Sequence, residues 1–389
     1  MTLTDQRPSE RHPSRRPERR PARRPSRSPA RHAAAPSRRE PGGTNRLLTG
    51  GLLVAGLCVA LVVLAVVAAA SGQLSIPPAE VASGFLRGLG LDMGPAESHP
   101  RADATLWSVR FPRVAMAIVV GAALAVAGAL MQGAFGNPLA EPSVVGVSAG
   151  AAVGAASAIV FGLTAFGAWT SVVCAFVAGI ITTGAVYLFS RSDGRTEVVT
   201  LVLTGIAVNA VAGAALAFLM FLGDTQAREE IVFWQLGSLS GSRWEYVLVV
   251  APVALLGLLL AARLARKLDL LALGERPARH LGVDVERLRI YSILLVGLLT
   301  AAAVAFCGIV AFVGLVVPHV VRMIAGPGHR LLLPASALGG AVCLVAADLL
   351  ARTAVNYAEL PLGMVTAAVG GPFFFWLLHR TRRTAGGWG

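Results

Sequence analysis

The chain has 389 residues, of which 55% are hydrophobic and only 14% are charged. Soluble globular proteins carry about 25% charged residues, so this composition, with a mean hydropathy of +0.67, excludes an ordinary soluble domain. Four cysteines are too few for a disulfide scaffold of this length. The formal net charge of +13 is concentrated in residues 1–46, which hold 13 arginines against four acidic residues.

Residues 1–46 are rich in Arg, Pro and Ser and contain little that could be buried. Such a segment cannot compensate the entropy of ordering, so we predict a disordered basic tail. One interpretation is an arm that binds nucleic acid or anionic lipid. The other is a solvated cytoplasmic extension that helps to set the membrane orientation. We favour the second interpretation and therefore expect no nucleic-acid partner.

Ten apolar segments follow the tail. The first is too long for the hydrophobic region of a signal peptide, about 7–15 residues, and suits a retained membrane span. Several segments are interrupted by Gly or Pro, and backbone freed in this way must be satisfied by neighbouring protein or a wet cavity. We therefore predict an all-α polytopic membrane protein with spans at about residues 47–71, 112–134, 143–162, 166–189, 198–222, 244–264, 289–308, 309–325, 331–351 and 362–379.

The distribution of Lys and Arg predicts the orientation of these spans. With the N-terminus inside, the tail and the inner connections hold 27 basic residues and the outer connections hold seven. Positive charge accumulates on the cytoplasmic side of membrane proteins. Both termini are therefore expected in the cytoplasm of a multi-pass protein of the cell membrane.

Two connections are long. Residues 72–111 are expected outside, with a short amphipathic stretch, PPAEVASGFLRGL. Residues 265–288 are expected inside and read as two short helices separated by Gly274 and Gly282, where chain reversal favours a positive φ. Apolar residues at helical spacing predict a face on this loop that docks another protein, the alternative being a loop lying on the membrane surface: Leu270, Leu273, Ala278 and Leu281.

Small and polar residues occur inside the apolar segments. Gly146, Gly150 and Gly154 are spaced by four, which suits either a subunit interface or close packing within one subunit. Asp348 and Arg352 are also four apart, so an internal ion pair is the simplest account. Polar residues at membrane depth are few and form no continuous chain, which disfavours an ion-coupled carrier: Gln132, Asn137, Glu141, Asn209, His319, Arg322, Asp348 and Arg352.

Motifs of catalysis, metal binding and nucleotide binding are missing from the sequence. It contains no CxxC, HExxH, GxSxG or EF-hand pattern and no GxxxxGK[ST] phosphate loop. The cysteines occur singly in apolar segments, as packing residues do. We therefore predict a protein that is not an enzyme, with no catalytic residue, no metal site and no cofactor of its own; any ATP and Mg would bind a partner.

Five stretches resemble one family of transport proteins. They are RFPRVAMAIVVGAALAVAGALMQGAFGNPLAEPSVVGVSAG at 110–150, FWQLGSLSG at 233–241, LALGERPARHLGV at 271–283, GIVAFVGLVVPHVVRMIAG at 308–326 and AADLLARTAVNYAELPLGMVTAAVGGPFFFWLL at 346–378. Together they resemble the FecCD-type permease subunits of ABC importers for iron–siderophores, haem and cobalamin. The resemblance covers residues 47–380, which implies a permease domain there and a cytoplasmic C-terminal tail at 381–389.

The resemblance implies ten spans with the type II importer architecture. It also implies a second permease subunit (a second copy or a paralogue), two ATPase subunits in the cytoplasm and an extracytoplasmic substrate-binding protein. The cytoplasmic loop 265–288 would then contact an ATPase as the coupling loop of the family. The residues expected to carry this contact are Leu273, Gly274, Glu275, Ala278, Leu281 and Gly282.

Two further sites are expected. A gate is predicted at the inner connection Arg195, Thr196 and Glu197, followed by a translocation path along a face formed by Gly205, Asn209 and Gly213, although helix packing explains that face nearly as well. The topology places three arginines at external ends of spans. Their resemblance to family arginines implies docking to acidic residues of the binding protein: Arg110, Arg113 and Arg352.

The expected function is the membrane-spanning subunit of an ATP-driven importer. We favour iron–siderophore chelates as its substrate because that class is broad in the family, with haem or cobalamin as the alternative. A zinc or manganese permease, a secondary transporter and a membrane enzyme fit less well. The sequence leaves open the exact substrate, the choice between homodimer and heterodimer, the role of the tail and the exact ends of the spans.

Overall fold

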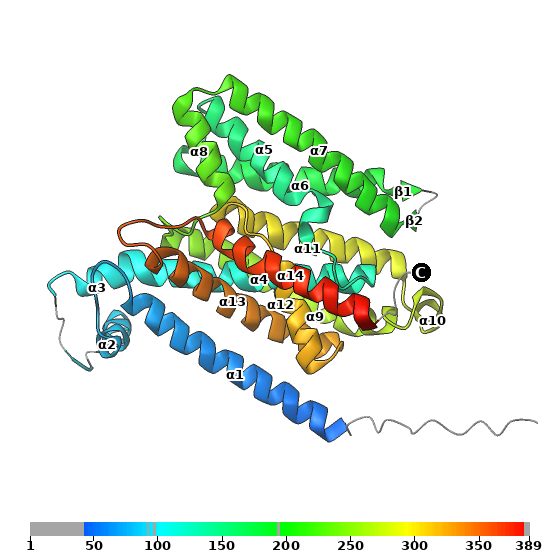
Figure 1. Cartoon of the computed structure of the whole chain (residues 1–389), viewed down its shortest axis with the longest axis horizontal. Coiled ribbons are helices and arrows are strands. Elements are labelled where there is room, and N and C mark those ends of the chain that lie inside the picture. The colour runs from blue at the N-terminus through cyan, green and yellow to red at the C-terminus, as the bar shows by residue number, and fades with distance from the viewer. Residues whose placement is uncertain (1–42, 92, 96–98, 193–194, 385–389) are drawn as a thin grey trace, which may run out of the picture. The chain divides into compact units, whose positions relative to one another are not determined.

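The computed structural model describes residues 43–91, 93–95, 99–192 and 195–384, and Figure 1 shows their arrangement. The described residues form helices and one two-stranded antiparallel hairpin, β1 (Arg191–Ser192) and β2 (Arg195–Thr196). The predicted tail, apart from residues 43–46, lies outside the described residues. Residues 43–46 already belong to the first helix, so the predicted boundary at residue 46 is four residues late.

Each of the ten predicted apolar segments contains a helix. Among the described residues, seven helices are long and apolar enough to cross a membrane: α1 (Gly43–Ala70), α4 (Phe111–Phe135), α6 (Thr170–Phe189), α7 (Val198–Leu222), α9 (Trp244–Leu271), α11 (Val285–Cys307) and α13 (His329–Thr353). Three shorter apolar stretches complete the set: α5 (Val147–Val160), α12 (Val313–Ala325) and the part Leu362–Leu377 of α14 (Leu362–Thr384). The prediction of an all-helical polytopic membrane protein is confirmed.

Short elements connect the apolar helices. The predicted amphipathic stretch forms α2 (Pro78–Gly88), and α3 (Ala102–Thr105) leads through a π-helical turn, Leu106–Arg110, into α4. Two 3₁₀ turns, Pro142–Val145 and Gly167–Trp169, precede α5 and α6. Helix α8 (Thr225–Leu236) follows α7, and α10 (Glu275–His280) lies between α9 and α11. In Figure 1, α10 and the hairpin lie at one end of the helices, and α2, α3 and α8 lie at the other.

Helix α4 is the centre of the packing. In the most apolar 18-residue stretch of the span Ala102–Phe135, which contains α4, 78% of the residues are buried. Helix α4 contacts α9, α11, α12 and α13. Two of these contacts leave no room for a side chain. A Cβ on Gly121 would lie 2.3 Å from the carbonyl oxygen of Gly340, and one on Gly128 would lie 1.7 Å from that of Gly314. Glycine allows the helix backbones to approach this closely.

The three glycines spaced by four pack inside the subunit. A Cβ on Gly150 would lie 2.1 Å from the Thr182 hydroxyl oxygen, and one on Gly154 would lie 2.3 Å from the Cys174 carbonyl oxygen. Both neighbours belong to α6, which therefore occupies this face of α5. Gly146 precedes α5 with a φ of +76° and starts the helix. The within-subunit interpretation of these glycines is confirmed.

Helices α5 and α12 start after breaks in the chain, and neighbouring protein satisfies the exposed backbone. The Glu141 carboxylate accepts a hydrogen bond from the backbone N–H of Phe312 at 3.1 Å, just before α12. Gln132 of α4 donates its side-chain amide to the carbonyl of Leu315 at 3.1 Å. Glu141, a polar residue that the sequence places at membrane depth, thus satisfies a backbone N–H at the start of α12, as a low-dielectric environment requires.

The loop that is predicted to contact an ATPase is shorter than residues 265–288. Helix α9 continues to Leu271, so the first of the two expected short helices is the end of a span, and only α10 stands alone. The apolar periodicity of α9 continues past the membrane-length segment through Leu264 and Leu268, which are both buried. At the C-terminus α14 continues to Thr384, so the predicted tail begins as helix; residues 385–389 lie outside the described residues.

The closest helix contact gives a stability test. Gly128→Ala is expected to lower the stability of the purified protein by about 1–3 kcal/mol, because the added methyl group meets backbone rather than a movable side chain. Gly184→Ala in α6 is the control, since a Cβ there meets no atom within 4 Å. Thermal unfolding in lipid nanodiscs measures both. Equal unfolding temperatures for the two variants would contradict the close packing of α4 on α12.

Candidate functional site

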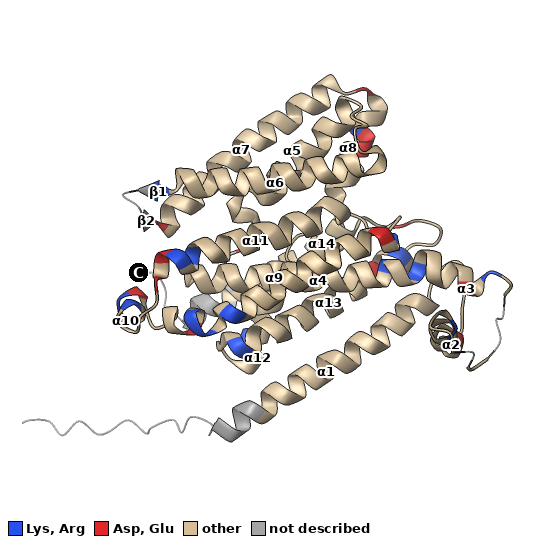
Figure 2. Cartoon of the chain, turned by 180° about the vertical axis from the view of Figure 1, so that it is seen from behind, with Lys and Arg blue, Asp and Glu red and all other residues tan. Residues whose placement is uncertain are grey.

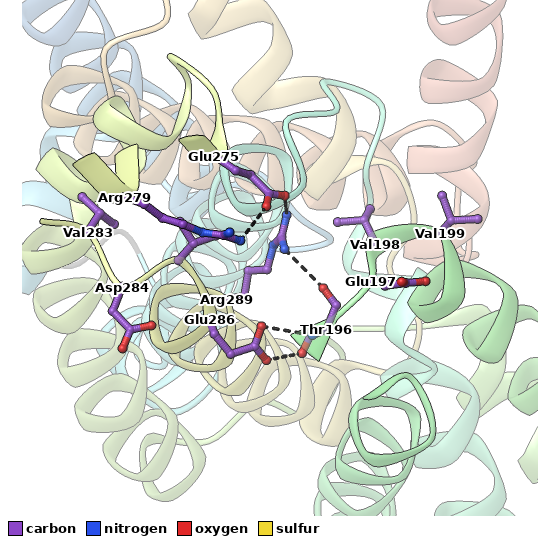
Figure 3. Close-up of a pocket in the computed structure, with 11 residues that line it drawn as sticks. Thr196, Glu197, Val198, Val199, Glu275, Arg279, Val283, Asp284, Glu286 and Arg289 are labelled. Carbon is purple, nitrogen blue, oxygen red and sulfur yellow. Dashed lines mark hydrogen bonds and ion pairs between the residues drawn. The ribbon is translucent and has the colours of Figure 1, made fainter. Parts of the chain in front are cut away.

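Two segments that the sequence analysis treats separately meet in one pocket. The pocket, about 830 Å³ in volume, lies between the hairpin, α10 and the first turns of α7 and α11 (Figure 3). The predicted gate and the predicted coupling loop both contribute to its lining. The lining residues are Thr196, Glu197, Val198, Val199, Glu275, Arg279, Val283, Asp284, Val285, Glu286 and Arg289.

Local sequence fixes the elements around the pocket. Gly274 and Gly282 flank α10 with φ values of +109° and +83°, so the prediction of positive φ at both turns is confirmed. Other residues rarely adopt this conformation. Asp284 caps α11, because its carboxylate accepts a hydrogen bond from the Arg287 backbone N–H at 3.0 Å. These signals place Glu286 and Arg289 on the first turns of α11.

Thr196 is bound to α11 through both its backbone groups. The Glu286 carboxylate accepts hydrogen bonds from the Thr196 backbone N–H at 3.0 Å and from its hydroxyl at 2.5 Å. The guanidinium of Arg289 donates to the Thr196 carbonyl oxygen at 3.2 Å. Glu286 and Arg289 are three apart and so lie on one side of the helix. The strand that leads into α7 is thereby held by two charged side chains of α11.

Arg289 also contacts α10. Its second terminal nitrogen donates to the carboxylate of Glu275, the first residue of α10. The other oxygen of that carboxylate accepts from Arg279 at 3.0 Å. Only 10% of the Arg289 side chain is exposed, against 44% for Glu275. A single buried guanidinium therefore connects α10 with the predicted gate, as the dashed lines of Figure 3 show.

The other predicted coupling residues differ in exposure. Ala278 is fully buried, whereas Leu273 and Leu281 are 64% and 59% exposed. The prediction that Ala278 and Leu281 share a face is wrong, because α10 ends at His280 and Leu281 belongs to the turn that precedes Gly282. Leu273 and Leu281 are the apolar side chains that a partner could cover here.

Sequence reasoning missed Glu286 and Arg289. It treated Arg289 only as one of the basic residues that set membrane orientation, and it did not single out Glu286. The charged pair spaced by three at the start of a helix was the available signal. Nothing local indicates the partner, because Thr196 lies 90 residues before Glu286 in the chain.

The gate and path residues lie in different environments. Glu197 is exposed and accepts a hydrogen bond from the Thr200 hydroxyl, while the side chain of Arg195 lies outside the described part. Gly205 is buried, and a Cβ there would lie 1.8 Å from the Val144 carbonyl oxygen, so packing explains this glycine. Asn209 is half-buried beside the Ser143 carbonyl, and Gly213 is exposed. The three therefore do not form one open face, because positions four apart drift around a helix.

A second cluster at the opposite end contains the three arginines predicted to dock the binding protein. Arg113 forms hydrogen bonds with the buried Asp348, at 3.0 Å and 3.1 Å, and with the half-exposed Glu359, at 2.9 Å and 3.1 Å. The expected Asp348–Arg352 contact also exists, at 3.5 Å. Asp348 is thus shared by two arginines, and Arg113 is its closer partner.

The other two arginines bind the end of α1. Arg110 donates to the carbonyls of Ala69, Ala70 and Leu74, and Arg352 donates to those of Ala68 and Ser71. Cations stabilise the carbonyl end of a helix. These contacts bury the arginine side chains almost completely, so they are not freely exposed charges. They line a pocket of about 370 Å³, through which a partner could reach them, and docking stays a prediction.

The positive charge of the second cluster lowers the pKa of Glu359, which lies in the loop after α13. Arg113, through its hydrogen bonds to Glu359, holds the pKa of that carboxyl below its usual range. Within the described ranges, no three His, Cys, Asp or Glu side chains gather in a way that could hold a metal ion. Figure 2 shows basic segments near this cluster and, more densely, at the end of the helices that carries α10.

Comparison with known proteins identifies similar chains. A model of the FecCD transport family matches residues 58–380. A hemin transport system permease of Yersinia pestis is 43% identical over 286 residues, which cover 72% of this chain and 85% of the relative. A cobalamin import system permease of Halobacterium salinarum is 42% identical over 279 residues, covering 72% and 74%.

One solved structure is also similar. It was assigned to the metal-chelate type of ABC transporter and has an inward-facing conformation. The match has a TM-score of 0.74 and 33% identity, and it covers 85% of this chain and 99% of the other. The type II importer architecture expected from the sequence is thereby confirmed.

The shared carboxylate of the second cluster gives a stability test. Asp348→Asn is expected to destabilise the protein by about 3–5 kcal/mol, because it removes the buried carboxylate that Arg113 and Arg352 share and leaves Arg113 with the half-exposed Glu359 alone. Glu359→Gln is the matched control and should cost about 0–1 kcal/mol, since that side chain is 46% exposed. Thermal unfolding in nanodiscs compares them. A larger loss in the Glu359 variant would refute the assignment of Asp348 as the main partner.

The lowered pKa of Glu359 predicts a pH dependence. The ionised carboxylate is stabilised in the folded state, so its contribution is complete above the ordinary glutamate value of about 4.3 and is lost as pH falls through the lowered folded pKa. The difference in unfolding temperature between the wild-type protein and Glu359→Gln should therefore shrink in this acidic range. A difference that stays constant from neutral pH to below pH 3 or so would contradict the Arg113–Glu359 contact.

Proposed function

Because the chain belongs to the FecCD transport family, we propose that it is the permease through which a binding-protein-dependent ABC importer carries haem or cobalamin. Membership alone makes it a multi-pass permease subunit that works with an ATPase and a binding protein and is not itself catalytic. The proposal concerns the substrate. It rests on two relatives above 40% identity, named for hemin and cobalamin transport.

The substrate preference from sequence analysis is thereby revised. Iron–siderophore chelates were favoured on the breadth of the family, with haem or cobalamin as the alternative. The named relatives support the alternative better than the first choice. Haem and cobalamin are both large, rigid metal chelates, so a path that admits one must be wide. We keep both as candidates, since binding proteins rather than permeases are expected to make most of the selection.

We also propose an assembly and an orientation. Two permease subunits, identical or paralogous, would join two ATPase subunits that bind ATP and Mg, with both termini of this chain in the cytoplasm. The excess of basic residues at the α10 end supports this orientation, since positive charge is retained in the cytoplasm. The arginine cluster beside α1 and α13 would then face outward, where the binding protein docks.

The translocation path is proposed along α7. The first turn of α7 borders the pocket beside α10, which would lie on the cytoplasmic side. Farther along the helix, Asn209 is half-buried and Gly213 is exposed. Gly205 supports this path indirectly, because it anchors α7 against the turn before α5. Opening at residues 195–199 would connect the path with the cytoplasm.

Transport by the reconstituted complex tests the substrate. The permease, its ATPase and its binding protein are placed in proteoliposomes, and ATP-dependent uptake of haem, cyanocobalamin and a ferric hydroxamate siderophore is measured. Uptake of haem or cyanocobalamin is expected to exceed that of the siderophore about tenfold or more, since burial of a matched ligand commonly gives such discrimination. Without ATP, uptake should be absent. Uptake of the siderophore alone would refute the proposal and restore the first choice.

A further inference from the structure

We infer that Arg289 is a positioning residue that makes α10 and the strand before α7 move as one unit. The inference rests on the proposed function in one respect, since it takes α10 as the element that contacts the ATPase. It adds a residue and a role that neither the sequence motifs nor the relatives assign.

The guanidinium of Arg289, a residue of α11, donates hydrogen bonds to two other elements, β2 and α10. One terminal nitrogen donates to the Thr196 carbonyl in β2, at 3.2 Å, and the other donates to the Glu275 carboxylate in α10. Guanidinium is planar, with its donors in a fixed relation, so the two acceptors cannot move independently while both bonds persist. A displacement of Glu275 therefore acts on Thr196.

Burial makes this contact costly to break. Only 10% of the Arg289 side chain is exposed, and its Nε already has no hydrogen-bond partner among the described residues. Loss of a further partner would leave more of a charged group unsatisfied in a poorly solvated place. Moving both elements together preserves the bonds. Glu286 accepts hydrogen bonds from the N–H and the hydroxyl of Thr196, so the same strand residue is also held to α11, the helix that carries Arg289.

The hollow provides room for the movement. The pocket of about 830 Å³ is lined by residues of β2, α10 and the starts of α7 and α11. In Figure 3, Glu197, Val198 and Val199 lie to the right of Arg289. Val199, which lines the pocket, is 71% exposed, whereas Leu201 in the same turn of α7 is fully buried. Thr196 is bound to α11 by Glu286 and to α10 through Arg289, so a displacement of α10 reaches the strand before α7 through this link.

The test measures the number of substrate molecules imported per ATP hydrolysed by the reconstituted complex. The substrate is whichever of haem and cyanocobalamin the wild-type complex imports. In Arg289→Gln this ratio is expected to fall about fivefold or more, at the low end of typical coupling between sites. Arg289→Lys should recover part of the loss, because an ammonium keeps the charge but lacks the rigid planar fork that holds Glu275 and Thr196 in a fixed relation.

Arg287→Gln is the matched control. It removes the same charge two residues away, from a side chain that is 76% exposed and paired only with Asp284 among the described residues. Its import ratio should equal that of the wild type. A purely structural role for Arg289 would lower the amount of folded complex without changing the ratio in the complex that remains.

A second variant keeps the inference testable if Arg289→Gln does not fold. Glu275→Gln removes the charge of the partly exposed carboxylate that binds Arg289. It should also lower the number of substrate molecules imported per ATP hydrolysed. Where both single variants fold, the double variant should be no worse than Arg289→Gln, because the two changes remove one interaction. The inference would be overturned if every folded variant of Arg289 and Glu275 imported as much substrate per ATP hydrolysed as the wild-type complex. Absence of import by the wild-type complex would instead count against the proposed substrates.

Discussion

The close approach of α4 to its neighbours is the constraint on which the described helices depend. Gly121 and Gly128 face backbone carbonyls of Gly340 and Gly314, so the helix axes lie too near one another for any side chain. In a membrane, association of helices relies on such packing because lipid is as apolar as the side chains. The central helix then fixes where α12 and α13 lie, and through α13 it positions the cluster of Arg110, Arg113 and Arg352.

Buried guanidinium groups serve one purpose at both ends of these helices. Arg113 joins α4 to Asp348 of α13 and to Glu359 in the following loop. Arg289 joins α11 to β2 and α10. In each case a planar group with several donors connects elements that are distant in sequence. Where one acceptor is a half-exposed carboxylate, as at Glu359 and Glu275, the link ends at a residue that a partner protein could reach.

The two ends differ in what surrounds the arginines. At the arginine cluster, Arg110 and Arg352 bind carbonyls at the end of α1 and hold this helix end in place. At the pocket beside α10 the link borders a hollow, and Val199 of α7 is exposed. The first arrangement favours a rigid surface. The second favours a segment that can be displaced.

The sequence by itself determined the ten apolar segments, the family and the turns at Gly274 and Gly282, because span length and backbone freedom are local properties. Only the tertiary structure decided that Arg289 meets both Thr196 and Glu275, that Arg110 and Arg113 are buried, and that Gly205 is packed while Gly213 is open. These facts depend on pairs of residues as far apart as Arg113 and Asp348, 235 positions along the chain. Periodicity places a residue on one side of its own helix, but the packing of other helices determines what that side meets.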